Sequence, residues 1–270
     1  MRIDSAKPAS EVVIYLDAVG KSFGRNGEIR ALEGVSCQIH DREFVAVLGP
    51  SGCGKSTMLR IIGGLIPYND GTVTVLGHPA KEPKDDVGIV FQSTNLLSWR
   101  TVEGNMRLGV ELQKLPDDKI REKVVTMIKM LGLNGFEKSY PHELSGGMRK
   151  RAALARSLVS DPDILLFDEP TTGLDVLVAR AVLDTVATLR DAGKCVIYST
   201  HIMREVERLC DRLAIIHRGR ILAAGSQRDL LEASEQPDLE EHFFDLVSQS
   251  ETHEKQYAST KTGPESEAGP

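Results

Sequence analysis

The feature that most constrains this chain is a glycine-rich segment, Gly49-Pro-Ser-Gly-Cys-Gly-Lys-Ser-Thr57, which directly follows the apolar run Phe44–Leu48. The pattern G-x-x-x-x-G-K-[ST] between a strand and a helix is typical of a phosphate-binding loop. Its glycines let backbone N–H groups converge on phosphate oxygens, and the dipole of the following helix favours the same anion. The segment therefore predicts a nucleotide site on an α/β scaffold rather than an accidental glycine turn.

Two polar side chains in this loop have separate predicted roles. Lys55 would supply a cation to the β- and γ-phosphates, and the Ser56 hydroxyl would help to hold Mg²⁺. The remaining positions are expected to form the cradle around the nucleotide: Gly49, Pro50, Ser51, Gly52, Cys53, Gly54 and Thr57.

Short apolar runs alternate with segments of helical period along the chain. The predicted strands are Val12–Leu16, Phe44–Leu48, Val73–Leu76, Val87–Phe91, Ile164–Phe167, Cys195–Tyr198 and Leu213–Ile216. The predicted helices are Ser56–Leu65, Asp117–Leu131, Gly147–Val159 and Val176–Asp191. The run at 164–167 is apolar at every position, which indicates a strand buried on both faces of a parallel sheet. We therefore expect an α/β fold with a mainly parallel central sheet.

A pair of carboxylates, Asp168 and Glu169, follows that buried strand. In open α/β sheets the chemistry gathers at the carboxyl ends of the strands. Asp168 would reach Mg²⁺, and Glu169 would lie near an attacking water as general base. A solvated turn before Pro170 is the alternative, and the phosphate loop earlier in the chain favours the metal site.

Composition limits the classes of function. Lys plus Arg number 33 against 39 Asp plus Glu, and this net charge of -6 argues against nucleic acid as a partner. No apolar run reaches the ~20 residues that a membrane-spanning helix needs. None of the four cysteines lies in a CxxC pair, so a zinc site or disulfide framework is not expected. We expect a flexible leader at 1–10, one folded domain at 11–247 and a disordered tail at 248–270.

Further motifs resemble those of one family. Leu144-Ser-Gly-Gly-Met148 resembles the LSGGQ signature of ABC transporter ATPases, with Met in place of the common Gln. The family's other marks stand in the family's order, over about residues 12–230. They are Phe23, which resembles the adenine-stacking aromatic, Gln92 of the Q-loop, Gly173-Leu-Asp175 of the D-loop and the switch residue His201.

The resemblance implies roles that these residues would not suggest singly. Gln92 would contact Mg²⁺ and couple the site to a partner, and His201 would contact the γ-phosphate and hold water and Glu169 in line. Asp175 is expected at the nucleotide. Without the resemblance, Gln92 would be an ordinary surface residue and His201 a polar strand end, and Phe23 could equally pack in a core.

The resemblance also implies an arrangement. It predicts a small antiparallel β subdomain near the N-terminus, a helical subdomain at about residues 96–160 and a head-to-tail dimer of two copies. Each ATP would lie between the phosphate loop of one chain and Ser145, Gly146 and Gly147 of the other. Independently, a serine and two glycines at a helix start can bind an anion, although Ser145 could simply cap its helix.

The implied activity is hydrolysis of ATP to ADP and phosphate, coupled to integral membrane permease subunits at the cytoplasmic face of the membrane. Subfamily signals differ along the chain. The first half resembles nitrate, sulfonate or taurine importers, the signature helix resembles lipid-transport ATPases, and the segment after residue 199 resembles sodium or multidrug exporters. A soluble ATPase that remodels a non-membrane partner is the alternative of another class.

Two further segments have open interpretations. Trp99 could lie at a permease interface or in the core. The basic run Arg149-Lys-Arg151 could contact phosphate or form a solvated helix face.

Overall fold

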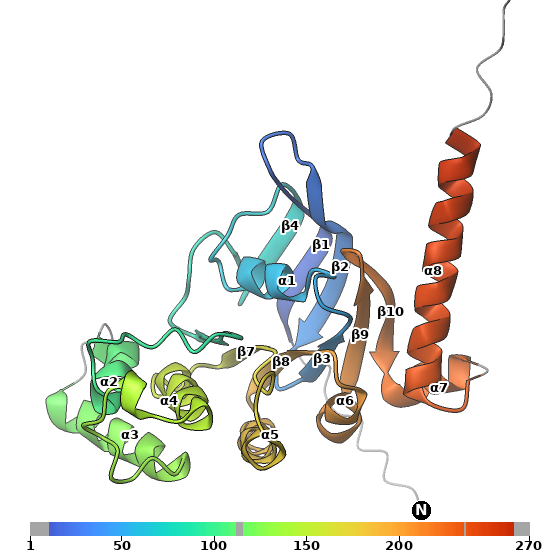
Figure 1. The fold of residues 1–270 in the computed structure, drawn as a ribbon. Coiled ribbons are helices and arrows are strands. Elements are labelled where there is room, and N and C mark those ends of the chain that lie inside the picture. Colours follow the sequence, from blue (N-terminus) through green and yellow to red (C-terminus); the bar gives the residue numbers. More distant parts are fainter. Residues whose placement is uncertain (1–10, 112–115, 235, 262–270) are drawn as a thin grey trace, which may run out of the picture.

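A computed structural model of the chain describes residues 11–111, 116–234 and 236–261. Two β-sheets lie face to face with helix α1 (Lys55–Ile62) between them, and helices at 146–158, 176–191 and 203–209 cover the opposite face of the larger sheet (Figure 1). This arrangement confirms the predicted α/β class.

The larger sheet has, among the described residues, the strand order β10-β9-β3-β8-β7-β6. Its strands are β3 (Phe44–Leu48), β6 (Val87–Val90), β7 (Ile164–Asp168), β8 (Cys195–Thr200), β9 (Arg212–His217) and β10 (Arg220–Ser226). Strand β3 pairs in parallel with β8 and β9, and β7 pairs in parallel with β6 and β8, whereas β10 runs antiparallel to β9. The mainly parallel sheet is therefore confirmed.

Strand β3 shows why the central strands carry no polar positions. Val45 and Val47 pack into the cluster around α1, while Ala46 and Leu48 pack into a cluster on the opposite face. All five residues of β3 are buried, as are all five of β7. A strand covered on both faces gains hydrophobic stabilisation from every side chain, and so its sequence does not alternate.

The smaller sheet is antiparallel, in the order β2-β1-β4-β5, as the resemblance implied. Its strands are β1 (Val12–Phe23), β2 (Ile29–His40), β4 (Asp70–Val75) and β5 (His78–Pro79). Sequence patterning missed β2, because its buried residues Leu32, Val35 and Ile39 are spaced by three and four, a helical spacing. Register shifts along its pairing with β1 allow this spacing within a strand.

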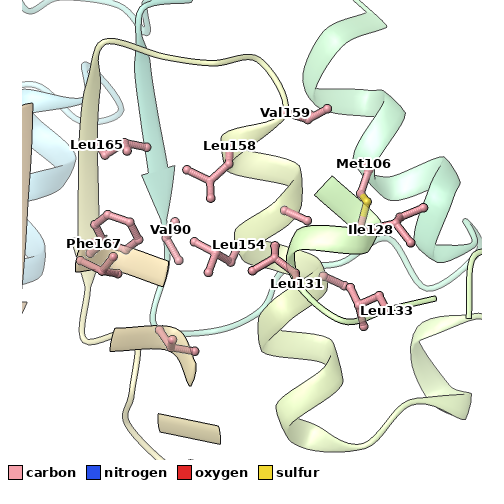
Figure 2. Close-up of a cluster of buried hydrophobic side chains, with 14 of the residues drawn as sticks. Val90, Met106, Ile128, Leu131, Leu133, Leu154, Leu158, Val159, Leu165 and Phe167 are labelled. Atoms are coloured by element: carbon pink, nitrogen blue, oxygen red, sulfur yellow. The ribbon is translucent and has the colours of Figure 1, made fainter. Parts of the chain in front are cut away.

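The chain between β6 and β7 forms helices α2 (Val102–Glu111), α3 (Asp117–Met130) and α4 (Gly146–Leu158), with a 3₁₀ turn at Pro141–Glu143. Figure 2 shows the apolar cluster that joins them to the sheet, in which Leu154 lies between Val90 and Phe167 on one side and Met106 and Ile128 on the other. These helices lie within the segment predicted as the helical subdomain.

The helices that follow β7 include α5 (Val176–Asp191), α6 (Met203–Leu209), α7 (Gln227–Ala233) and α8 (Leu239–Lys261). Over the ranges that the structure describes, no helix has the length and apolar character needed to cross a membrane.

The prediction of a disordered tail from residue 248 is wrong as far as Lys261, because α8 continues to that residue. Near its start, Phe243 and Leu246 pack against the cluster that contains Leu213 and Ile215, and this packing stabilises the helix. The residues beyond include good helix formers such as Gln249, Glu251 and Lys255, but also serines and threonines, and composition alone does not distinguish such a segment from disorder. The predicted leader, 1–10, and residues 262–270 lie outside the described residues.

Helix α1 yields a test of the packing between the two sheets. Ile61 is 0% exposed, whereas Ile29 at the start of β2 is 64% exposed. We expect Ile61→Ala to lower the free energy of unfolding by about 2–5 kcal/mol, since it leaves a cavity between the sheets. The matched change Ile29→Ala should cost at most about 0.5 kcal/mol. Denaturant unfolding followed by circular dichroism measures both, and equal losses would contradict the packing described here.

Candidate active site

The phosphate loop connects the end of β3 to the start of α1, and its glycines are required by its shape. Gly54 has φ +114° and caps α1 without a side-chain hydrogen bond. A Cβ atom on Gly54 would lie 2.5 Å from the Ala31 carbonyl oxygen, and one on Gly49 would lie 2.2 Å from the Ile216 carbonyl oxygen. At these two positions the loop passes too close to neighbouring backbone for a side chain, and it leaves the first N–H groups of α1 available to an anion.

Lys55 begins α1 and is only 3% exposed. Its Nζ donates to the carbonyl oxygens of Gly49 (2.8 Å) and Pro50 (2.9 Å) and forms an ion pair with Glu169 Oε1 at 2.9 Å. A buried ammonium group requires such partners, because it has lost its hydration. The loop thus holds one positive charge at a fixed point beside its N–H groups.

Asp168 ends β7 and lies next to the first turn of α1. Its Oδ1 accepts hydrogen bonds from Ser56 Oγ (2.8 Å) and Ser199 Oγ (3.1 Å). The described residues hold no cluster of three or more His, Cys, Asp or Glu that could bind a metal. Mg²⁺ does not need one, since it commonly takes one or two carboxylates together with phosphate oxygens and water. The adjacent oxygens of Ser56 and Asp168 fit that donor set.

Glu169 follows at the carboxyl edge of the sheet, and three of the predicted site residues meet at its side chain. Its Oε2 accepts a hydrogen bond from Gln92 Nε2 at 3.2 Å and lies 3.4 Å from His201 Nδ1, while its Oε1 faces Lys55. Thr172 Oγ1, which sequence reasoning missed, also donates to Oε2 at 3.1 Å. Residues far apart in the sequence therefore converge on one carboxylate.

The backbone and the charge of Glu169 are both constrained. Its φ is +45°, a sparsely populated conformation that persists only where the surroundings enforce it. Its N–H donates to Ser199 Oγ at 3.1 Å. Burial raises the pKa of the carboxyl, but the hydrogen bond and charge of Lys55, with help from Thr172 and His201, outweigh burial and hold the pKa below its usual value. The side chain is therefore an ionised acceptor at neutral pH.

A small pocket lies at this point. Its lining comes from the loop and α1 (Ser51, Gly52, Gly54, Lys55, Ser56 and Thr57) and from Ala31, Gln92 and Glu169. Its volume is about 180 Å³, less than the roughly 300–1,000 Å³ of pockets that enclose a drug-sized ligand. The pocket can take the phosphate end of a nucleotide, and the rest must lie on the open surface.

The predicted signature residues are not among the residues that line this pocket. Ser145 caps α4 and accepts a hydrogen bond from Met148 N at 3.2 Å, and Gly146 and Gly147 open the helix. A Cβ atom on Gly147 would lie 2.8 Å from Val178 Cγ1. The capping interpretation of Ser145 is confirmed, and its proposed contact with a nucleotide would require a second chain.

Asp175 and Phe23 also lie outside the pocket lining. The Asp175 carboxylate caps α5, accepting from Leu177 N and Val178 N, both at 3.0 Å. Phe23, at the end of β1, is 39% exposed, and Lys21 Nζ lies 4.9 Å from its ring centroid. Core packing of Phe23 is therefore wrong.

The structure excludes one alternative for each of the two segments with open interpretations. Trp99 is 73% exposed and is not a core residue. Arg149 donates to the Leu144 carbonyl at 2.6 Å and Arg151 to the Leu131 carbonyl at 2.9 Å, so both act as internal tethers. Lys150 donates to the Gln92 carbonyl, and burial lowers the pKa of its ammonium against the opposing charges of Asp168 and Glu169. The basic run is thus partly buried and is not a solvated face.

Comparisons with known proteins agree with this geometry. The profile of the family described as ABC transporter matches residues 32–172. An uncharacterised ABC transporter ATP-binding protein of Methanocaldococcus jannaschii is 39% identical over 208 residues, covering 76% of this chain and 78% of that protein. The methionine import ATP-binding protein MetN of Geobacillus kaustophilus is 32% identical over 252 residues, with coverage of 90% and 74%.

Two further similarities concern transport and assembly. The taurine import ATP-binding protein TauB of Rhizobium johnstonii is 37% identical over 204 residues, covering 74% of this chain and 77% of that protein. A solved dimeric post-hydrolysis state of an ATP-binding cassette, bound to ADP and Pi, is 31% identical with a TM-score of 0.73, covering 79% of this chain and 98% of that one. The chain therefore belongs to the ABC transporter family, as an ATP-binding subunit with ATPase activity.

Proposed function

We propose that two copies of this chain hydrolyse MgATP at shared sites and thereby drive separate permease subunits from the cytoplasmic face of a membrane. The observation that carries the proposal is the convergence of Lys55, Gln92 and His201 on the single carboxylate of Glu169. Such a cluster beside a phosphate loop has the parts that phosphoryl transfer to water requires.

Each of these side chains has a proposed role in ATP hydrolysis. The N–H groups of the loop and Lys55 bind the phosphates, and a phosphate that contacts Lys55 competes with Glu169 for the ammonium. Glu169, once released from the lysine, can accept a proton from water and orient it toward the γ-phosphorus. His201 lies close enough to Glu169 to keep water, carboxylate and γ-phosphate in line.

Ser56 and Asp168 would hold Mg²⁺. The Gln92 amide donates a hydrogen bond to Glu169 and so lies at the same edge of the sheet. When bound, Mg²⁺ neutralises charge on the β- and γ-phosphate oxygens. The exposed ring of Phe23 is proposed to stack on adenine, which must lie outside the small phosphate pocket.

A second copy would supply what the pocket lacks. Ser145, Gly146 and Gly147 present a helix start to solvent, with Ser145 exposed, and are proposed to contact the γ-phosphate of ATP bound to the partner chain. Asp175 is proposed to lie at the same boundary. The dimeric form of the similar ADP-bound cassette supports this assembly.

For cargo we propose import of a small polar solute, of the nitrate, sulfonate or taurine class. The resemblance of the first half of the chain supports import, as do the import functions in the names of the MetN and TauB relatives. Co-purification with a polytopic membrane protein would support a permease partner, and co-purification with ribosomes or a soluble scaffold would contradict it.

The first prediction concerns the general base. Glu169→Gln keeps the shape of the side chain but removes the proton acceptor, so we expect kcat for MgATP to fall on the order of 10²–10⁴-fold. Nucleotide binding should persist, because the loop contacts are unchanged. Phosphate release and binding of a fluorescent nucleotide measure the two effects. Glu207→Gln, at an exposed position on α6, is the matched control, and a Glu169→Gln variant as active as the parent would contradict the proposal.

The second prediction concerns the shared site. Ser145→Arg should abolish hydrolysis while leaving nucleotide binding to the loop intact, and Lys55→Ala should lose both. A mixture of the two inactive proteins should regain part of the activity, because a mixed dimer joins an intact loop to an intact signature. A site completed within one chain would give a mixture as inactive as its components.

A further inference from the structure

A buried carboxylate outside the described site is the strongest unassigned feature of the molecule. Glu205 lies on α6 and is 5% exposed. Its Oε1 accepts a hydrogen bond from Thr171 Oγ1 at 2.6 Å, and its Oε2 accepts from Thr200 Oγ1 at 2.6 Å and Tyr198 Oη at 3.0 Å. Three hydroxyl donors therefore satisfy a charge that burial would otherwise make very costly.

The three donors come from the two segments that carry the proposed catalytic groups. Thr171 lies two residues after Glu169, in the turn that follows β7. Thr200 directly precedes His201, and its Oγ1 also accepts a hydrogen bond from Ile202 N at 3.1 Å. Glu205 thus connects the turn of Glu169 to the strand end of His201.

Tyr198 anchors this connection in the core. Its ring is 0% exposed and lies between the rings of Phe44 and Phe167, with centroids 6.1 Å and 6.0 Å away. Burial and the neighbouring Glu205 charge raise the pKa of the Tyr198 phenol, which therefore remains a hydrogen-bond donor. The carboxylate is consequently tied to a part of the fold that does not move freely.

The catalytic pair needs such support. Glu169 has φ +45°, and its Oε2 lies 3.4 Å from His201 Nδ1, although both residues follow the ends of their strands. The strained backbone of Glu169 and its distance to His201 persist only if the surrounding structure fixes the turns after β7 and β8.

We propose that Glu205 is a positioning residue for ATP hydrolysis, whose carboxylate fixes Thr171 and Thr200 and thereby holds Glu169 and His201 in their relative orientation. This inference rests on the roles proposed for Glu169 and His201. Glu205 itself does not line the phosphate pocket and touches none of the reacting groups.

The test compares hydrolysis with binding. Glu205→Gln and Thr171→Val each remove part of the connection, and we expect kcat for MgATP to fall on the order of tenfold in each, as displacement of catalytic groups requires. KM for ATP should change less than about twofold, because the loop contacts stay in place. Thr171→Ser restores the hydroxyl and should restore kcat.

A double variant tests whether the two residues act as one unit. If Thr171 acts through Glu205, then Glu205→Gln with Thr171→Val should lose no more kcat than Glu205→Gln alone. Glu207→Gln, on the exposed face of the same helix, is the control and should behave like the parent.

A purely structural role gives a different result. Lower melting temperatures with unchanged kcat per nucleotide-binding site in Glu205→Gln and Thr171→Val would overturn the proposal. If Glu205→Gln does not fold, the kcat of Thr171→Val tests the positioning role by itself, since this variant leaves the Glu205 carboxylate and its two other donors in place. Glu169→Gln, assayed in parallel, separates the proposed function from the positioning role of Glu205. If Glu169→Gln retains hydrolysis, the proposed function is refuted. If Glu169→Gln loses hydrolysis but Thr171→Val keeps the kcat of the parent, only the positioning role is refuted.

Discussion

The parallel pairing of β3, β8 and β7 is the constraint on which the rest of the molecule depends. Its register places Leu48 opposite Thr200 and Asp168 opposite Ser199. The three strands therefore end at one edge of the sheet, and the residues that follow them are neighbours. The phosphate loop therefore meets Asp168, Glu169 and His201 at this edge, although more than a hundred residues of the chain separate it from them.

This edge concentrates charges that water hardly reaches. Lys55, Asp168, Glu169 and Glu205 are all buried. Each has partners that compensate for lost hydration, and each electrostatic interaction is stronger there than it would be in water. The same compensation links the groups, since a phosphate that takes over Lys55 changes the environment of Glu169. The ion pair between Lys55 and Glu169 would thus connect the binding of phosphate to the proposed base.

The single chain presents the two proposed halves of an ATP site at different places. The phosphate pocket is too small to enclose a nucleotide, and the signature helix starts elsewhere with a serine that caps it. A head-to-tail pair would bring these halves together without rebuilding either of them. Hydrolysis would then depend on the distance between the two copies. A permease partner could control hydrolysis by changing that distance.

The sequence by itself determined the local features. Glycines that alone fit the loop, uniformly apolar strands and the acids at a strand end follow from steric and hydrophobic rules acting on neighbouring residues. Tertiary structure decided the remainder. Strand β2 was not predicted, because its buried residues have a helical spacing. Helix α8 forms where packing against Leu213 and Ile215 stabilises a polar segment. The proposed role of Glu205 depends on hydroxyl groups from two other segments of the chain. Such partners are chosen by strand register and by the need to satisfy buried charge, and neither can be read from a local pattern.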